Sequence, residues 1–134
     1  MSQEQRKVRV LVVEDSPLVA DQVRELLQEV TSCATPIAVV ATEKEAVLAA
    51  LDMNPDLVIL DLHLKQGTGF GVLKALSAKE FPPTIAVLTN YALPKYRDLA
   101  RLRGAHYFLD KALDFDRLPG IVEHVGQSRE SRLN

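Results

Sequence analysis

The sequence predicts an α/β protein in which parallel strands alternate with helices. Short apolar runs rich in β-branched residues recur along the chain, and stretches with apolar residues at helical spacing lie between them. Pro, Gly, Asn and Asp mark most of the boundaries, which indicates short connections. With 134 residues, 47% of them hydrophobic and 25% charged, the chain can bury one core. We therefore expect a single domain.

Taken in order, the pattern predicts strands and helices in strict alternation. The expected strands cover residues 8–13, 37–41, 57–61, 84–88 and 107–109. The expected helices cover residues 17–30, 43–53, 70–78, 94–103 and 115–125. Residues 1–7 are polar and are expected to be disordered, residues 8–125 form the domain, and residues 126–134 are expected to be a flexible tail.

Local signals indicate where the helices begin and end. Pro17 suits the first turn of a helix, with Asp15 or Ser16 before it as the cap. Thr42 and Glu45 have the spacing of a capping box for the second helix. Prolines or a glycine follow the second, third and fourth helices and end them.

The repeated strand–helix units predict the topology. Short loops between them imply right-handed crossovers and a parallel sheet covered by helices on both faces. For a chain of this size we expect a flavodoxin-like (βα)5 sandwich, with a five-stranded sheet in the order 2-1-3-4-5. The first and third strands are then neighbours, so the residues that follow them meet at one edge of the sheet.

Acidic residues follow both of these neighbouring strands. Glu14 and Asp15 come directly after the first strand, and Asp61 ends the third. Three carboxylates in a partly buried notch repel one another, and a hard divalent cation relieves that repulsion. Oxygen ligands favour Mg²⁺, with Mn²⁺ as the alternative, and the three histidines have no zinc spacing. Considered alone, Glu14 and Asp15 could instead cap the first helix, a role compatible with metal binding.

Two further strands end in groups that can bind phosphoryl oxygens. Thr89 follows the fourth strand and carries a hydroxyl, and Lys111 follows the fifth and carries an ammonium. Each alone has an ordinary interpretation, Thr89 as a strand former and Lys111 as a solvated cation. Because both fall on the same edge as Asp61, the pattern favours a site for phosphoryl chemistry.

Four segments in this order resemble the receiver domain of two-component response regulators, of the stand-alone, single-domain type. They are residues 12–17, 57–64, 87–90 and 104–111, and the likeness extends over about residues 8–125. The resemblance implies that Asp61 accepts a phosphoryl group from a phosphohistidine on a sensor histidine kinase or a histidine phosphotransfer protein. It implies no enzyme activity beyond self-catalysed phosphotransfer and autodephosphorylation.

The resemblance also assigns roles to the surrounding residues. Asp15, Asp61 and the main-chain carbonyl of His63 match the family's metal ligands, and Glu14 would act through a metal-bound water. Lys111 would pair with a phosphoryl oxygen.

A two-state switch is the remaining implication of the resemblance. Thr89 would move to hydrogen-bond the phosphoryl group, and Phe108 matches the aromatic residue that turns inward with it. Tyr107 and Phe108 point to opposite faces of the strand, and the spacing from Lys111 favours Phe108.

Several positions depart from the family pattern. Lys65 stands where Pro is common, and Ala112 follows Lys111 where a Pro with a cis bond is frequent. A cis bond to Ala costs about 3–4 kcal/mol, so the isomer of this peptide stays open. We hypothesise that Asn90 and His63 obstruct the water that hydrolyses the aspartyl phosphate and so lengthen its lifetime.

The glycine-rich segment 67–71 has the look of a dinucleotide-binding loop, because it follows a strand and opens a helix. That pattern would need glycine at position 72, where Val72 stands. We interpret the segment as a turn.

Composition limits the partners. The net charge of −2 with scattered basic residues predicts no nucleic-acid binding by this chain, and no apolar run suits a membrane span or a signal sequence. Cys33 is alone, so no internal disulfide is possible, and we expect a cytoplasmic protein. Output is expected through a partner protein or a homodimer, on the face of the fourth helix, fifth strand and fifth helix.

Three alternatives stay open. A degenerate receiver would act as a phosphorylation-independent interaction module. A Mg²⁺-dependent phosphohydrolase would use an Asp nucleophile, but the sequence shows neither a second acid to serve as general acid nor a lid. A flavodoxin-like nucleotide or flavin carrier would need a phosphate cradle after the first strand, where Glu14 and Asp15 would repel a phosphate.

Overall fold

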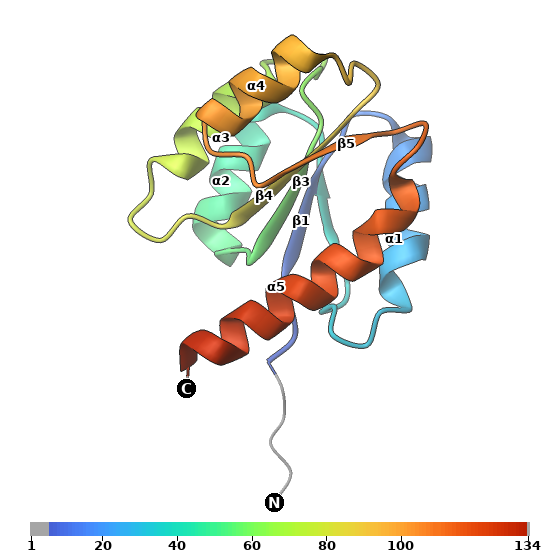
Figure 1. Ribbon diagram of the computed structural model, residues 1–134, viewed down its shortest axis with the longest axis vertical. Coiled ribbons are helices and arrows are strands. Elements are labelled where there is room, and N and C mark those ends of the chain that lie inside the picture. The colour runs from blue at the N-terminus through green and yellow to red at the C-terminus, as the bar shows by residue number, and fades with distance from the viewer. Residues whose placement is uncertain (1–5, 134) are drawn as a thin grey trace, which may run out of the picture.

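A parallel sheet lies between two layers of helices in the computed structural model, which describes residues 6–133 and the side chains of residues 6–128 (Figure 1). The strands are β1 (Val10–Val13), β2 (Ala38–Val40), β3 (Leu57–Leu60), β4 (Thr84–Thr89) and β5 (Tyr107–Asp110). The helices are α1 (Pro17–Gln28), α2 (Glu43–Met53), α3 (Gly69–Ser77), α4 (Pro94–Leu102) and α5 (Leu118–Leu133), with a 3-10 turn (Phe115–Arg117) before α5. None of the helices within this range combines the length and apolar character needed to cross a bilayer.

The strand order is β2-β1-β3-β4-β5 with every pairing parallel, which confirms the expected topology. In the register between β1 and β3, Val13 lies opposite Leu60, the last residue of each strand. The N–H of Asp61 donates to the carbonyl of Val13 at 3.0 Å, which continues the pairing by one residue. This register brings the residues that follow β1 and β3 together.

The two faces of the sheet are covered by different helices (Figure 1). Alternate residues of β1 point to opposite faces, as expected for a strand. Val10 and Val12 pack with the apolar sides of α1 and α5, whereas Leu11 and Val13 pack with those of α2, α3 and α4. Both faces of the central strands are therefore buried, which is why these strands read as continuous apolar runs.

The helix starts agree with the capping signals. Ser16 is the N-cap of α1, where its Oγ accepts from the N–H of Val19 at 3.3 Å. Thr42 is the N-cap of α2, and its Oγ1 accepts from the N–H of Glu45 at 3.1 Å. Helix α1 ends at Gln28, two residues before the expected end.

The two ends of the chain differ from the expectation. Helix α5 continues through Leu133, so its expected end at Val125 is wrong. A side chain at position 126 would press against Val8, which favours glycine there, and the helix continues because most residues after it favour helices. At the other end, Arg6 forms a 3.1 Å ion pair with Asp56, although disorder was expected over residues 1–7. Residues 1–5 and 134 lie outside the described residues.

Candidate functional site

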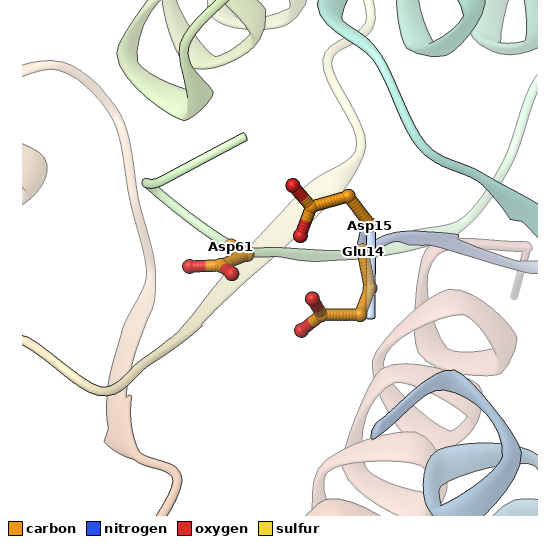
Figure 2. Close-up of side chains that lie close together, drawn as sticks. All are labelled: Glu14, Asp15 and Asp61. Carbon is orange, nitrogen blue, oxygen red and sulfur yellow. The ribbon is translucent and has the colours of Figure 1, made fainter. Parts of the chain in front are cut away.

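Three carboxylates meet at the edge of the sheet where β1 and β3 end. Glu14 and Asp15 follow β1, and Asp61 follows β3. Figure 2 shows their side chains pointing to the same side, and one oxygen from each lies within 4.8 Å of the others. The structure thus brings together the three acids that the sequence analysis singled out.

Lys111 forms ion pairs with two of these acids. Its Nζ lies 2.7 Å from Oε1 of Glu14 and 2.9 Å from Oδ2 of Asp61. The three side chains are only 8%, 4% and 7% exposed, respectively. Lys111 reaches this position because it follows β5, and its N–H donates to the carbonyl of Thr89 at 3.0 Å. The alternative interpretation of Lys111 as a solvated cation is therefore wrong.

Burial and charge have opposite effects on the pKa values of Glu14 and Lys111. Burial raises the pKa of Glu14 above its ordinary value, and the hydrogen bonds from Lys111 and from the N–H of Ser16 offset part of that effect. For Lys111, burial alone would lower the pKa, but hydrogen bonds to Glu14 and Asp61 and the charges of both acids raise it instead. The ammonium is therefore held in its charged form between the two acids.

A main-chain N–H group donates to one oxygen of each acid. The N–H of Ser16 donates to Oε2 of Glu14 at 3.0 Å, and that of His63 donates to Oδ1 of Asp61 at 3.1 Å. The N–H of Lys65 donates to Oδ2 of Asp15 at 2.7 Å. The loop between β3 and α3 is thus fastened to two of the three acids through its own backbone.

Thr89 is fully buried at the end of β4. Its Oγ1 accepts a hydrogen bond from the N–H of Tyr91 at 3.1 Å, which holds the start of the β4–α4 loop. Because an accepting hydroxyl keeps its own proton, Thr89 can still donate to a second group.

Phe108 lies on the side of the sheet that carries α4 and is 8% exposed. The guanidinium of Arg97 on α4 lies 5.6 Å from the centre of its ring. Tyr107 packs instead with the core on the opposite face, which confirms the expected alternation.

One contact beside the site was not foreseen from the sequence. The ring of His63 lies 4.1 Å from that of Tyr91, centre to centre, so it contacts the β4–α4 loop beside the acids. Asn90, the residue before Tyr91, is exposed. The Lys111–Ala112 peptide is trans.

The donor set suits a hard divalent cation. Three carboxylates lie close enough for one ion to reach an oxygen of each, and oxygen-only ligands are those that Mg²⁺ and Mn²⁺ prefer. Among the described side chains, one ammonium contacts the cluster of three acids, so the cluster keeps an excess of negative charge. Glu14, Asp15 and Asp61 therefore fit a Mg²⁺ site.

Comparison with known proteins identifies the family. Residues 10–123 match the response regulator receiver domain family. The chain is 34% identical over 125 residues, 92% of its length, to a nitrate/nitrite response regulator protein homolog of Haemophilus influenzae, of which the match covers 59%. It is 32% identical over 111 residues, 83% of its length, to the sensory transduction protein LytT of Bacillus subtilis, of which the match covers 45%. The chain thus spans about half the length of these relatives.

Solved structures share the fold. The signal receiver domain of a putative LuxO repressor protein from Vibrio parahaemolyticus superposes with a TM-score of 0.80 at 26% identity, covering 95% of this chain and 96% of that one. The receiver domain of the putative response regulator NarL from Mycobacterium tuberculosis gives a TM-score of 0.81 at 24% identity, covering 91% and 98%.

The fold and the acidic cluster define a flavodoxin-like α/β protein with its site at the carboxyl ends of the strands. Within that class, the chain belongs to the response regulator receiver domain family of two-component signalling. Receiver domains are generally phosphoacceptors rather than enzymes, and they bind Mg²⁺ at an acidic pocket.

Proposed function

We propose that Asp61 accepts a phosphoryl group from a phosphohistidine on a sensor histidine kinase or a histidine phosphotransfer protein. The observation that carries the proposal is the contact of Asp61 with Lys111 at 2.9 Å, inside a cluster of three acids. A carboxylate that is both ion-paired and placed at the open edge of a parallel sheet can act as a nucleophile.

In the proposed step an oxygen of Asp61 attacks phosphorus. The new O–P bond forms as the N–P bond to the donor histidine breaks, and the imidazole, which carries a proton on its other nitrogen, leaves as the neutral side chain. The Nζ of Lys111 stays close enough to pair with a phosphoryl oxygen. Glu14, Asp15, Asp61 and the carbonyl of His63 would hold Mg²⁺, which neutralises charge on the phosphoryl oxygens.

The proposed switch couples this site to the α4 side of the sheet. The hydroxyl of Thr89, which accepts from Tyr91, would turn to donate to the phosphoryl group and would take the β4–α4 loop with it. Phe108 packs on the face that carries α4, next to Arg97, and would adjust to that movement.

The proposed output surface is the face formed by α4, β5 and α5, where a partner protein or a second copy of the chain would bind. Leu102 at the end of α4 and Leu113 after β5 are 82% and 77% exposed. Both would be covered by a protein bound to this face.

The proposal is tested by incubation with acetyl phosphate, with and without Mg²⁺, followed by intact-mass measurement. We expect a gain of one phosphoryl group that requires Mg²⁺ and is lost in Asp61→Asn. Asp98→Asn, which removes an exposed carboxylate on α4, is the matched control and should be phosphorylated as the original chain is. No mass gain under any condition would contradict the proposal and favour a phosphorylation-independent module. Continuous consumption of acetyl phosphate with no mass gain would instead favour a phosphohydrolase.

A further inference from the structure

The glycine-rich turn before α3 encloses the side chain of Glu43. Glu43 is the first residue of α2, and its N–H donates to the carbonyl of Gln66 at 3.2 Å. Its Oε1 accepts from the N–H of Thr68, the N-cap of α3, at 2.8 Å. One residue of α2 therefore contacts the turn through both its backbone and its carboxylate.

Two glycines make room for this side chain. A Cβ on Gly71 would overlap the carboxylate of Glu43, and a Cβ on Gly67 would overlap its Cβ. Gly67 also has φ of +77°, a conformation that other residues rarely adopt. The segment that has the look of a dinucleotide loop in the sequence thus holds a protein carboxylate in this structure.

The position is also electrostatically favourable. The carboxylate lies at the amino-terminal ends of both α2 and α3, where unpaired N–H groups attract negative charge. Glu43 is half-buried, so solvent screens this attraction less than at an open surface.

The turn that Glu43 holds is the same segment that contacts the phosphorylation site. At its start, the N–H of His63 donates to Asp61, and that of Lys65 donates to Asp15. At its end, Gln66 and Thr68 are fastened to Glu43. The β3–α3 loop is therefore anchored to acidic side chains at both ends.

We propose that Glu43 is a positioning residue for the acidic site. By fixing the end of the β3–α3 loop, it fixes the distance from the Lys65 N–H to Asp15 and the direction of the His63 carbonyl. The effect on metal binding rests on the proposed function, whereas the anchoring of the loop does not.

The first experiment compares three variants by calorimetric titration with Mg²⁺. Glu43→Ala removes the acceptor and should weaken Mg²⁺ binding about tenfold, as loss of a group that orients metal ligands typically does. Glu43→Gln keeps an acceptor oxygen, so it should bind Mg²⁺ more tightly than Glu43→Ala and nearly as tightly as the original chain. Asp52→Ala removes an exposed negative charge from the other end of α2, so its affinity should stay near that of the original chain. Equal weakening in the Asp52 and Glu43 variants would overturn the proposal, because charge alone would then explain it.

The second experiment breaks the contact without changing the charge. The atoms that a Cβ on Gly71 would meet belong to the flexible end of Glu43, so Gly71→Ala should fold and displace the carboxylate from Thr68. We expect Gly71→Ala to weaken Mg²⁺ binding as much as Glu43→Ala does. The double variant should bind Mg²⁺ no more weakly than either single variant. Unchanged affinity in Gly71→Ala, or effects that multiply in the double variant, would overturn the proposal.

Amide hydrogen exchange separates this inference from the proposed function. The N–H groups of Thr68 and Lys65 should exchange faster in Glu43→Ala and in Gly71→Ala, with or without metal. If the original chain binds no Mg²⁺ but amide exchange is faster in the two variants, the proposed metal site is wrong and the anchoring of the loop by Glu43 is supported. If exchange at both amides is unchanged, the claim that Glu43 anchors the loop is wrong.

Discussion

Replacing Lys111 with methionine removes the only ammonium that contacts the acidic cluster within the described residues. Met has a similar length and no charge, so the variant leaves Glu14 and Asp61 facing each other without a counterion. Both carboxylates are buried, at 4% and 7% exposed, and neither can regain full hydration. We expect the variant to fold but to be markedly less stable in the absence of Mg²⁺.

The magnitude follows from the burial of the ion pairs. Removing one partner of a buried pair typically costs about 3–5 kcal/mol, and a cluster at the rim of the sheet belongs near the lower value. At roughly 3–4 °C per kcal/mol for a domain of this size, the melting temperature should fall by about 10 °C. The loss should be smaller at pH 5 than at pH 7, because the pKa of Glu14 is already raised by burial and protonation then removes one of the two charges.

Thermal unfolding with and without Mg²⁺ measures both parts of this prediction. A ligand that binds only the folded chain adds about 2.7 kcal/mol when present at 100 times its dissociation constant. Because Mg²⁺ supplies the positive charge that Lys111→Met lacks, it should stabilise the variant more than the original chain. Lys65→Met is the matched control, since it removes an exposed charge from the same rim and keeps the N–H that donates to Asp15. Equal melting temperatures for the two variants, or equal Mg²⁺ stabilisation of variant and original, would refute the electrostatic reasoning.

Three further predictions concern single residues around the site and in the core. Gly69→Ala should lower the free energy of unfolding by several kcal/mol, because a Cβ there would overlap the main-chain carbonyl of Asp61, which cannot move as a side chain can. Denaturant unfolding measures this change, and a loss below about 1 kcal/mol would contradict the prediction. Cys33 is buried, and burial raises the pKa of its thiol, so alkylation near neutral pH should be slow in the folded chain and fast in urea. Rapid labelling without denaturant would contradict that placement. His63→Ala removes the ring that contacts Tyr91 beside the site and should shorten the lifetime of the aspartyl phosphate; a decay rate equal to that of the original chain would refute the hypothesis.

The topology and the acidic cluster could be predicted because they depend on short-range signals. Apolar runs of strand length end in Glu14 and Asp61, and parallel strands place their carboxyl ends at one edge of the sheet. Once the order 2-1-3-4-5 is assumed, the neighbouring positions of these acids follow. Capping residues such as Thr42 were likewise predicted correctly, since a cap contacts residues only three positions away.

The contacts that were missed join residues that are distant in the sequence. Glu43 contacts Thr68 because α2 packs beside α3, and no periodicity in either helix indicates that pairing. The contact between His63 and Tyr91 similarly depends on how two loops fold over the edge of the sheet. The glycines of the β3–α3 turn were a usable signal, because closely spaced glycines indicate that another group approaches the backbone.

The end of α5 was predicted wrongly for a different reason. Polar composition after Val125 was interpreted as a flexible tail, yet Glu, Arg and Gln are good helix formers and no proline interrupts them. Polarity shows that a segment is not buried, but it does not show that a helix has ended. Polarity was also a poor guide to disorder at Arg6, because this polar side chain forms an ion pair with the buried Asp56.

The central claim is that Asp61 is the group that accepts phosphorus. Borohydride reduction of the phosphorylated chain, followed by peptide mass mapping, locates an acyl phosphate at a single residue, because the phosphorylated carboxyl is reduced and the others are not. We expect the modification at Asp61, in samples treated with acetyl phosphate and Mg²⁺. Modification at Glu14 or Asp15 instead, or none in a chain that binds Mg²⁺, would contradict the assignment.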